Sequence, residues 1–326
     1  MNQEESNVGG QALIEGVMMR GKSNYTIAVR KESGDIKLIH RDITSIKEKW
    51  PIFKTPFLRG IIALFENLAI GMKSLIISAN EALPEEEKQK SKKAEGFTIF
   101  LMVLTSIVFG MGIFVAIPNI VTEVMGIQET VEPLLFNLIA GAFRMIMFVL
   151  YVFAISLMKD VKRVFQYHGA EHKAVNAYEA GQELTMENAK SFTTYHPRCG
   201  TSFMFFVFFV SIFIFSVVPV VFLAVFPWFK PLHVVYQKLI LIPSHILLLP
   251  LVAGISYELI KISFKKKDNK FFQLIAKPGY YIQKLTTKEP DEQQIEVALA
   301  ALNEVVAIME QEKEAENVAE PNPTLA

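Results

Sequence analysis

The chain has a single cysteine, Cys199, among its 326 residues, which excludes an internal disulfide. Charged residues are also scarce, at 20% against the roughly 25% usual for soluble domains. Neither sign is in excess, because 33 Lys and Arg balance 33 Asp and Glu, so the charge gives no reason to expect nucleic acid as a partner. Apolar residues, by contrast, form 51% of the chain, and its mean hydropathy is +0.31. This composition predicts a membrane protein with modest water-facing parts.

Four segments are long and apolar enough to cross a hydrocarbon layer about 30 Å thick, which takes roughly 20 helical residues. They are 97–117, 134–158, 202–226 and 239–260. The second segment carries Arg144, and the fourth carries His245 and Glu258. Because a charge inside a membrane needs a partner, we expect Arg144 to pair with Glu66.

Lysine and arginine are distributed unevenly between these segments. Lysines precede the first segment, several Lys and Arg lie in 159–201, and a run of lysines follows the fourth segment. The two other connections are poorer in basic residues: 118–133 has no Lys or Arg, and 227–238 has two lysines. Basic loops are retained on the cytoplasmic side of a membrane. Both termini and the loop 159–201 are therefore expected in the cytoplasm.

A fifth helix is predicted over 55–82. Its polar residues Arg59, Glu66, Lys73 and Asn80 recur every seven positions and so stack along one face. One interpretation is an amphipathic helix lying in the membrane interface. The other is a re-entrant or spanning helix whose polar stripe lines a cavity, which would move the N-terminus to the opposite side.

By composition the chain divides into four parts: 1–54, 55–96, 97–264 and 265–326. The first holds a glycine-rich opening and a β-hairpin turning at Ser33-Gly34-Asp35, and the second holds the amphipathic or re-entrant helix and a basic linker. The third is the four-span domain, and the last holds a helix with apolar spacing over 295–309 and a tail expected to be disordered from Glu314. The predicted fold class is a mainly α-helical multi-pass membrane protein, with about four transmembrane helices, one amphipathic or re-entrant helix and small cytoplasmic α+β parts.

The loop 159–201 concentrates the chemistry. His168 and His172 lie one helical turn apart, so both imidazoles can reach one ion, and Glu171 is placed to act on a water beside it. This H-x-x-E-H spacing is that of the inverted zincins, in which the glutamate is the general base. The helix is expected to end near Gly181, since glycine commonly terminates helices.

Further ligands follow in His196 and Cys199, just before the third span. All four side chains together would form a closed structural zinc site, whereas three ligands and a water would form a catalytic site. Glu179 lies seven residues after His172 and is an alternative third ligand. The interpretation without metal is that the histidines meet lipid phosphates, with Lys162, Arg163, Lys173 and Arg198 supplying an anion-binding surface.

Four motifs resemble the YqhQ-like bacterial membrane proteins, a family of unknown function labelled as predicted metal-dependent enzymes. They are residues 8–21 (VGGQALIEGVMMRG), 167–172 (YHGAEH), 196–201 (HPRCGT) and 254–258 (GISYE). The resemblance covers the chain to about Asn303 and implies a bacterial cytoplasmic-membrane protein. It directs attention to Gln11, Glu15 and Arg20, which could close over the loop, and to Glu258, which could approach it from the fourth span.

These observations predict an enzyme with a divalent metal ion, zinc first among the candidates, held by His168 and His172 with His196 or Cys199, and Glu171 as the base. The expected substrate is a lipid, a lipid-linked precursor or a membrane peptide reached at the cytoplasmic surface, and anionic membrane lipids are the expected partners. The alternative is a transporter, scramblase or scaffold in which zinc braces the loop and the 55–82 stripe lines a polar path with Arg144. The sequence leaves the oligomeric state open, a homo-oligomer included.

Overall fold

The glycine-rich opening folds as strands. In the computed structural model, which describes residues 8–84, 95–229, 231–266 and 269–319, it forms β1 (Gly9–Leu13) and β2 (Gly16–Arg20). The predicted hairpin is confirmed as β3 (Asn24–Arg30) and β4 (Ile36–Asp42), with Gly34 at φ +93° in its turn. All four strands pair antiparallel in the order β1-β2-β3-β4. The predicted hairpin is thus the second half of a four-stranded meander, whose first two strands were not predicted.

The sheet is covered on both faces, which explains why β2 and β3 contain consecutive apolar residues. Val17, Met19 and Ala28 face one hydrophobic core, which they share with α7 (Lys159–Glu179) and α12 (Glu292–Ala319). The alternate side chains, such as Met18 and Ile27, face a second core beneath α2 (Leu58–Ala82). Successive strand residues point to opposite faces, so a sheet buried on both sides needs apolar residues at nearly every position.

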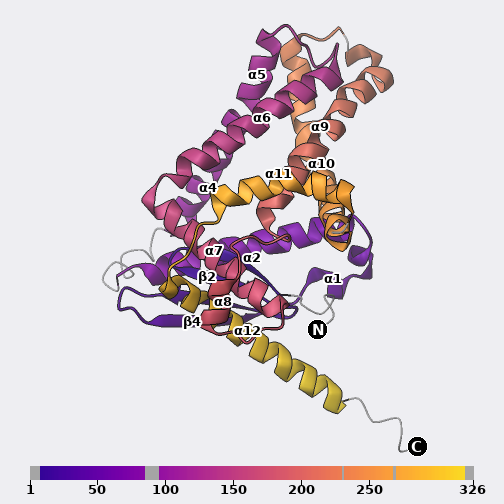
Figure 1. The fold of residues 1–326 in the computed structure, drawn as a ribbon. Coiled ribbons are helices and arrows are strands. Elements are labelled where there is room, and N and C mark those ends of the chain that lie inside the picture. The colour runs from indigo at the N-terminus through magenta and orange to yellow at the C-terminus, as the bar shows by residue number, and fades with distance from the viewer. Residues whose placement is uncertain (1–7, 85–94, 230, 267–268, 320–326) are drawn as a thin grey trace, which may run out of the picture.

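The other helices complete a lobe and a bundle (Figure 1). The short elements are α1 (Ile46–Lys49), η1 (Pro51–Lys54), α8 (Met186–Ser191) and η3 (Pro227–Phe229). The bundle comprises α4 (Glu95–Met111), the π-helical η2 (Gly112–Ala116), α5 (Ile117–Val124), α6 (Pro133–Ser156), α9 (Gly200–Val225) and α10 (Val234–Lys265). Finally, α11 (Lys270–Thr286) crosses the bundle near its base.

Five helical stretches in the described residues are long and apolar enough to cross a membrane, which indicates a membrane protein. They are 58–82, 100–124, 133–156, 200–225 and 235–263. The last four correspond to the predicted spans. Many apolar side chains on them are exposed, such as Phe109 at 66% and Leu247 at 80%, as expected for surfaces covered by lipid.

The remaining stretch, 58–82 in α2, lies across the base of the bundle in Figure 1 rather than along it. One side contacts the sheet through Ile70 and Leu75, and Gly60 packs against Tyr257 of α10. A sheet with open edges does not lie within hydrocarbon. This packing supports the interpretation of α2 as an interfacial helix, with Phe65 and Leu68 exposed on its outer side.

The polar stripe of α2 does not line one path with Arg144. Arg144 donates to Asn119 Oδ1 at 2.7 Å, and Glu66 instead accepts hydrogen bonds from Ser45 and from the backbone N–H of Ile46. The predicted Arg144–Glu66 pair is therefore wrong. The partner of the buried Arg144 is the Asn119 amide on α5, a contact between helices that residue spacing along a single helix could not predict.

One prediction for the C-terminal region is also corrected, and one helix there was missed. The helix expected over 295–309 is confirmed as part of α12, but α12 continues to Ala319, so disorder does not begin at Glu314. Residues 320–326 lie outside the described part of the chain. The helix α11 was not predicted at all, because Pro278 and Gly279 interrupt its pattern.

Candidate metal centre

The helix α7 carries the H-x-x-E-H motif on the side facing the lobe's core. Ala170, Ala174 and Val175 are buried against β1, β2 and α12 and fix the rotation of α7. The predicted end near Gly181 is confirmed, since the last helical residue is Glu179 and Gly181 has φ +67°.

Three predicted ligands converge. One ligand atom from each of His168, His172 and Cys199 lies within 4.8 Å of the other two. Cys199 Sγ lies 3.4 Å from His168 Nε2. The thiol reaches this position because Cys199 is the N-cap of α9, immediately after the loop returns to the bundle.

Both imidazoles are oriented through their other nitrogen. His168 Nδ1 lies 2.9 Å from the carbonyl oxygen of Thr286, and His172 Nδ1 lies 2.6 Å from that of Thr194. A carbonyl can only accept, so each Nδ1 carries a proton, and in the neutral ring each Nε2 then presents a lone pair. Outer hydrogen bonds of this kind fix the tautomer of metal-binding histidines.

His196 lies beside the three converging residues but outside their set. Its ring centroid is 5.6 Å from that of His172, and its Nε2 lies 3.4 Å from Glu179 Oε1. Burial lowers the pKa of His196, with the charge of Glu171 acting in the opposite direction. The four-ligand set of His168, His172, His196 and Cys199 is therefore not assembled in this structure.

Glu171 is buried at 5% exposure, and its Oε2 lies 3.5 Å from His172 Nε2. Gly10 of β1 forms the wall behind it, because a Cβ at that position would lie 2.6 Å from Glu171 Oε1. Gly9 has no such neighbour within 4 Å. The glycine-rich motif thus contacts the site at Gly10, where the lack of a side chain leaves room for Glu171.

The alternative ligand Glu179 is occupied by other groups. It pairs with Arg198, whose guanidinium also donates to the Val8 carbonyl oxygen at 3.3 Å. Arg198 is half-buried, and burial lowers its pKa. The pair joins the end of α7 to the residue before Cys199, so Glu179 has a bracing contact rather than a place among the converging ligands.

Two residues hold the returning loop: Lys173, which the sequence assigned to a lipid-binding surface, and Asn176, which sequence reasoning did not single out. Lys173 is buried and donates to the carbonyl oxygens of Lys190 and Phe192 at 3.0 and 2.7 Å. Asn176 donates to those of Thr193 and Tyr195 at 3.0 and 2.9 Å. With the bond from His172 to Thr194, α7 contacts five backbone carbonyls of the segment 190–195, a set of contacts that we call the loop clamp. Lys173 and Asn176 follow His172 by one and four residues, so they lie near it on the helix, and this spacing was the sequence signal that could have identified them.

The expected surface of cations for lipid phosphates is wrong in most of its members. Lys173 is buried in the loop clamp, Arg198 pairs with Glu179, and Arg163 pairs with Glu15. Lys162 and Arg163 are the exposed members.

The N-terminal residues expected to close over the loop lie elsewhere. The Gln11 amide contacts Gly71 of α2, and Arg20 pairs with Asn67 and Glu66 of the same helix. Both therefore point to the sheet face opposite α7. Glu15, at φ +52° in the β1–β2 turn, does reach α7, where it binds Arg163 and accepts from the Tyr167 hydroxyl at 3.3 Å.

Glu258 does not join the three converging residues. Its carboxylate binds the Arg59 guanidinium through two contacts, one of them 2.7 Å from Nε to Oε1. This pair connects α10 to α2, where Gly254 also packs against the Phe57 backbone. Glu258 thus fastens the bundle to α2.

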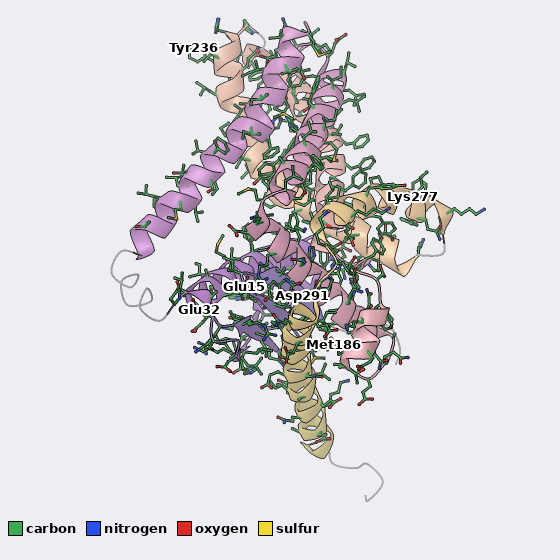
Figure 2. All side chains as sticks on the ribbon, turned by 60° about the vertical axis from the view of Figure 1, so that its left-hand side comes forward. Glu15, Glu32, Met186, Tyr236, Lys277 and Asp291 are labelled. Atoms are coloured by element: carbon green, nitrogen blue, oxygen red, sulfur yellow. The ribbon has the colours of Figure 1, made fainter. Side chains whose placement is uncertain are left out.

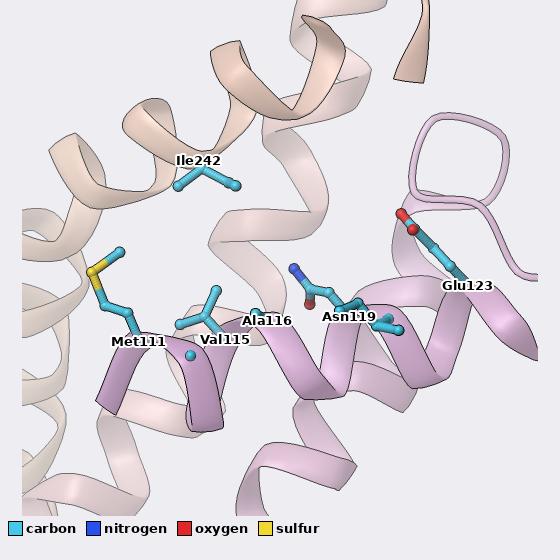
Figure 3. Close-up of a pocket in the computed structure, with 8 residues that line it drawn as sticks. Met111, Val115, Ala116, Asn119, Glu123 and Ile242 are labelled. Carbon is cyan, nitrogen blue, oxygen red and sulfur yellow. The ribbon is translucent and has the colours of Figure 1, made fainter. Parts of the chain in front are cut away.

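A pocket of about 310 Å³ lies at the far end of the bundle, between the α4–α5 stretch and α10 (Figure 3). Its walls are mainly apolar, with Met111, Val115 and Ile242 among them, and Asn119 and Glu123 supply its polar atoms. It shares no residue with the His/Cys cluster.

Comparison with known proteins confirms the resemblance seen in the motifs. Residues 55–308 match the family described as "Protein of unknown function (DUF1385)". The chain is 33% identical over 315 residues to the "Uncharacterized protein YqhQ" of Bacillus subtilis (strain 168), covering 92% of each chain. No solved structure matches significantly. The chain therefore belongs to the DUF1385 family and is a YqhQ-like protein.

Proposed function

We propose that this protein is a metal-dependent hydrolase of the bacterial cytoplasmic membrane, acting at the cytoplasmic surface on a lipid, a lipid-linked precursor or a membrane peptide. The observation that carries the proposal is the convergence of His168, His172 and Cys199 beside a buried carboxylate, Glu171. Three ligands leave a coordination position open, which is the arrangement of catalytic rather than structural zinc sites.

The donor set fits zinc. Zn–N and Zn–S distances of about 2.1 and 2.3 Å place the two donor atoms about 3.6 Å apart around a tetrahedral ion. The separation of His168 Nε2 and Cys199 Sγ is 3.4 Å. The remaining separations lie within 4.8 Å, so the His172 ligand atom needs to approach by at most about 1 Å. A zinc ion bound here would act as a Lewis acid that polarises a carbonyl or phosphoryl oxygen of the substrate, and it would lower the pKa of a bound water to about 7.

Glu171 is suited to take a proton. In the neutral ring of His172, Nδ1 carries the hydrogen donated to Thr194 and Nε2 carries none, which leaves Glu171 Oε2, 3.5 Å away, as an acceptor for water. During hydrolysis the water oxygen bonds to the acyl or phosphoryl centre while Glu171 receives the water proton. Glu171 then returns that proton to the leaving oxygen or nitrogen, and the base is regenerated.

The site's place in the fold supports a membrane substrate. Cys199 caps a candidate membrane helix, α9, and Thr286, which holds His168, ends α11 at the base of the bundle. Basic residues on both sides of the loop favour a cytoplasmic location.

Polar contacts inside the bundle favour a second candidate, a transporter or scramblase in which zinc is structural. Besides the contact of Arg144 with Asn119, His245 Nε2 lies 3.7 Å from Glu129 Oε1; Glu129 is buried and His245 is partly buried. Such groups commonly mark pathways through membranes. The two candidates differ in their need for Glu171.

The test uses the full chain in lipid nanodiscs, loaded with zinc and incubated with a total bacterial lipid extract, with products identified by mass spectrometry. A hydrolase releases a headgroup, acyl chain or carrier that requires zinc and is not released by the Glu171→Gln variant. Products formed equally by the variant would contradict the assignment of Glu171. No product with bacterial lipids or membrane peptides, together with ion or lipid movement across vesicles, would favour the second candidate.

A further inference from the structure

The helix α11 has an unusual charge distribution. Lys270, Lys277 and Lys284 recur every seven residues, and the segment 270–286 contains no acidic residue. Seven residues are close to two helical turns, so the three ammonium groups lie along one side. All three side chains are exposed, and Figure 2 shows Lys277 projecting away from the rest of the molecule. This side of α11 is therefore a basic surface.

Apolar side chains lie beside the lysines. Phe271, Leu274 and Tyr281 are exposed by 63%, 63% and 66%. Lys284 Nζ lies 5.4 Å from the centre of the Tyr281 ring. Exposed apolar residues bordered by lysines on one helix are typical of interfacial membrane helices.

The chain also constrains where α11 can lie. The candidate span in α10 runs to Ser263, and α11 starts seven residues later at Lys270. Figure 1 shows α11 crossing the bundle at the level where α7 leaves α6. A helix tethered this closely to the end of a span lies at the lipid headgroups.

The inner side of α11 holds the candidate metal centre. Gln283 is fully buried; its Oε1 accepts from the His196 N–H at 3.1 Å, and its Nε2 donates to the His196 carbonyl oxygen at 3.0 Å and to Ser202 Oγ at 2.9 Å. The Thr286 carbonyl oxygen accepts from His168 Nδ1. Cys199 lies between the two residues that Gln283 holds.

We propose that α11 docks on anionic headgroups of the bilayer that contains the bundle, and that this docking holds residues 196–202 and His168 in the arrangement seen here. Three cations on a helix that itself contains no acidic residue match an anionic surface, and the exposed apolar residues match the acyl boundary. The inward contacts transmit the position of α11 to the loop. The consequence for the metal centre rests on the proposed function, whereas the docking and the order of the loop do not.

The experiment measures amide hydrogen exchange on the full chain without zinc, in nanodiscs of phosphatidylcholine alone or with phosphatidylglycerol. Anionic lipid is expected to slow exchange in both 270–286 and 196–202. A lysine near an anionic surface changes such an equilibrium about fivefold, so replacing Lys270, Lys277 and Lys284 by Gln removes on the order of a hundredfold of this protection. Replacing Lys22, Lys31 and Lys313 by Gln removes the same charge from the lobe and leaves the protection unchanged.

A second variant separates docking from its effect on the loop. Gln283→Leu is expected to keep the lipid-dependent protection of 270–280 and to lose that of 196–202. Equal exchange in both kinds of disc overturns the docking, and protection of α11 without protection of 196–202 in the wild type overturns the coupling. A concentration-dependent protection that is independent of lipid charge would assign the surface to a second copy of the chain. A zinc-binding failure with these results intact would overturn the proposed function alone.

Discussion

Cys199 Sγ lies 3.4 Å from His168 Nε2, although 31 residues separate the two along the chain. One residue belongs to a helix of the lobe and the other caps a helix of the bundle. The contact therefore forms only when the loop between them folds back on α7. A metal ion shared by these side chains would fasten the lobe to the membrane domain.

The composition of the ligand set is tested by a pair of substitutions. Cys199→Ser removes a soft thiolate, and we expect zinc affinity to fall on the order of a hundredfold or more, since even outer-shell changes cost about 10- to 100-fold. His196→Asn should bind zinc like the wild type, because Asn can accept the Arg198 N–H as His196 Nδ1 does. Competition titration with a zinc chelator measures both. A large loss in His196→Asn would show that a four-ligand set forms.

The role of Glu171 is tested by separating metal binding from turnover. Glu171→Gln is nearly isosteric and leaves both imidazoles and the thiol in place, so zinc affinity should be retained. Turnover should fall by about 10²- to 10⁴-fold, the usual contribution of a general base. Chelator titration and product release on the same preparation provide both values. Loss of zinc in this variant would instead make Glu171 a ligand.

The wall behind Glu171 is tested at two neighbouring glycines. Gly10→Ala places a Cβ 2.6 Å from Glu171 Oε1, so the carboxylate must move. We expect a loss of stability of about 1–3 kcal/mol, as for other overpacked sites, and reduced turnover. Gly9→Ala meets nothing within 4 Å and should resemble the wild type in thermal unfolding and in rate. Equal behaviour of the two variants would contradict the proposed contact.

The loop clamp is tested at Lys173. Lys173→Met leaves the carbonyl oxygens of Lys190 and Phe192 without their donor, which should lower the free energy of local opening of 186–195 by about 2–4 kcal/mol. Amide exchange in that segment measures the change. The control is Lys190→Met, which removes an exposed ion pair with Glu292 and should not change exchange there. Normal exchange in Lys173→Met would show that Asn176 and His172 suffice.

Periodicity and composition predicted the elements of this protein better than their contacts. The spans followed from long apolar runs, and the end of α7 followed from Gly181. The partners of Gln11 and Arg20 were wrong because a meander, and not a lone hairpin, decides which sheet face each residue occupies. Once β1 pairs with β2, alternation sends Gly10 toward Glu171 and Gln11 toward α2.

Charged residues were the hardest to place from sequence. Lys173 and Arg198 look like parts of a lipid-binding surface, yet both are taken up by carbonyls or a carboxylate within the lobe. A buried cation is tolerated only with such partners, and these come from segments distant in sequence. The lysines of α11 carry the same positive charge but remain exposed. Tertiary packing alone distinguishes the two groups.

The central claim is that His168, His172 and Cys199 bind one metal ion, and elemental analysis of the purified full chain tests it most directly. Wild type supplied with zinc should contain one ion per chain, and His168→Ala should contain little or none. No bound metal in the wild type, or an equal content in His168→Ala, would contradict the proposed metal centre and the hydrolase built on it.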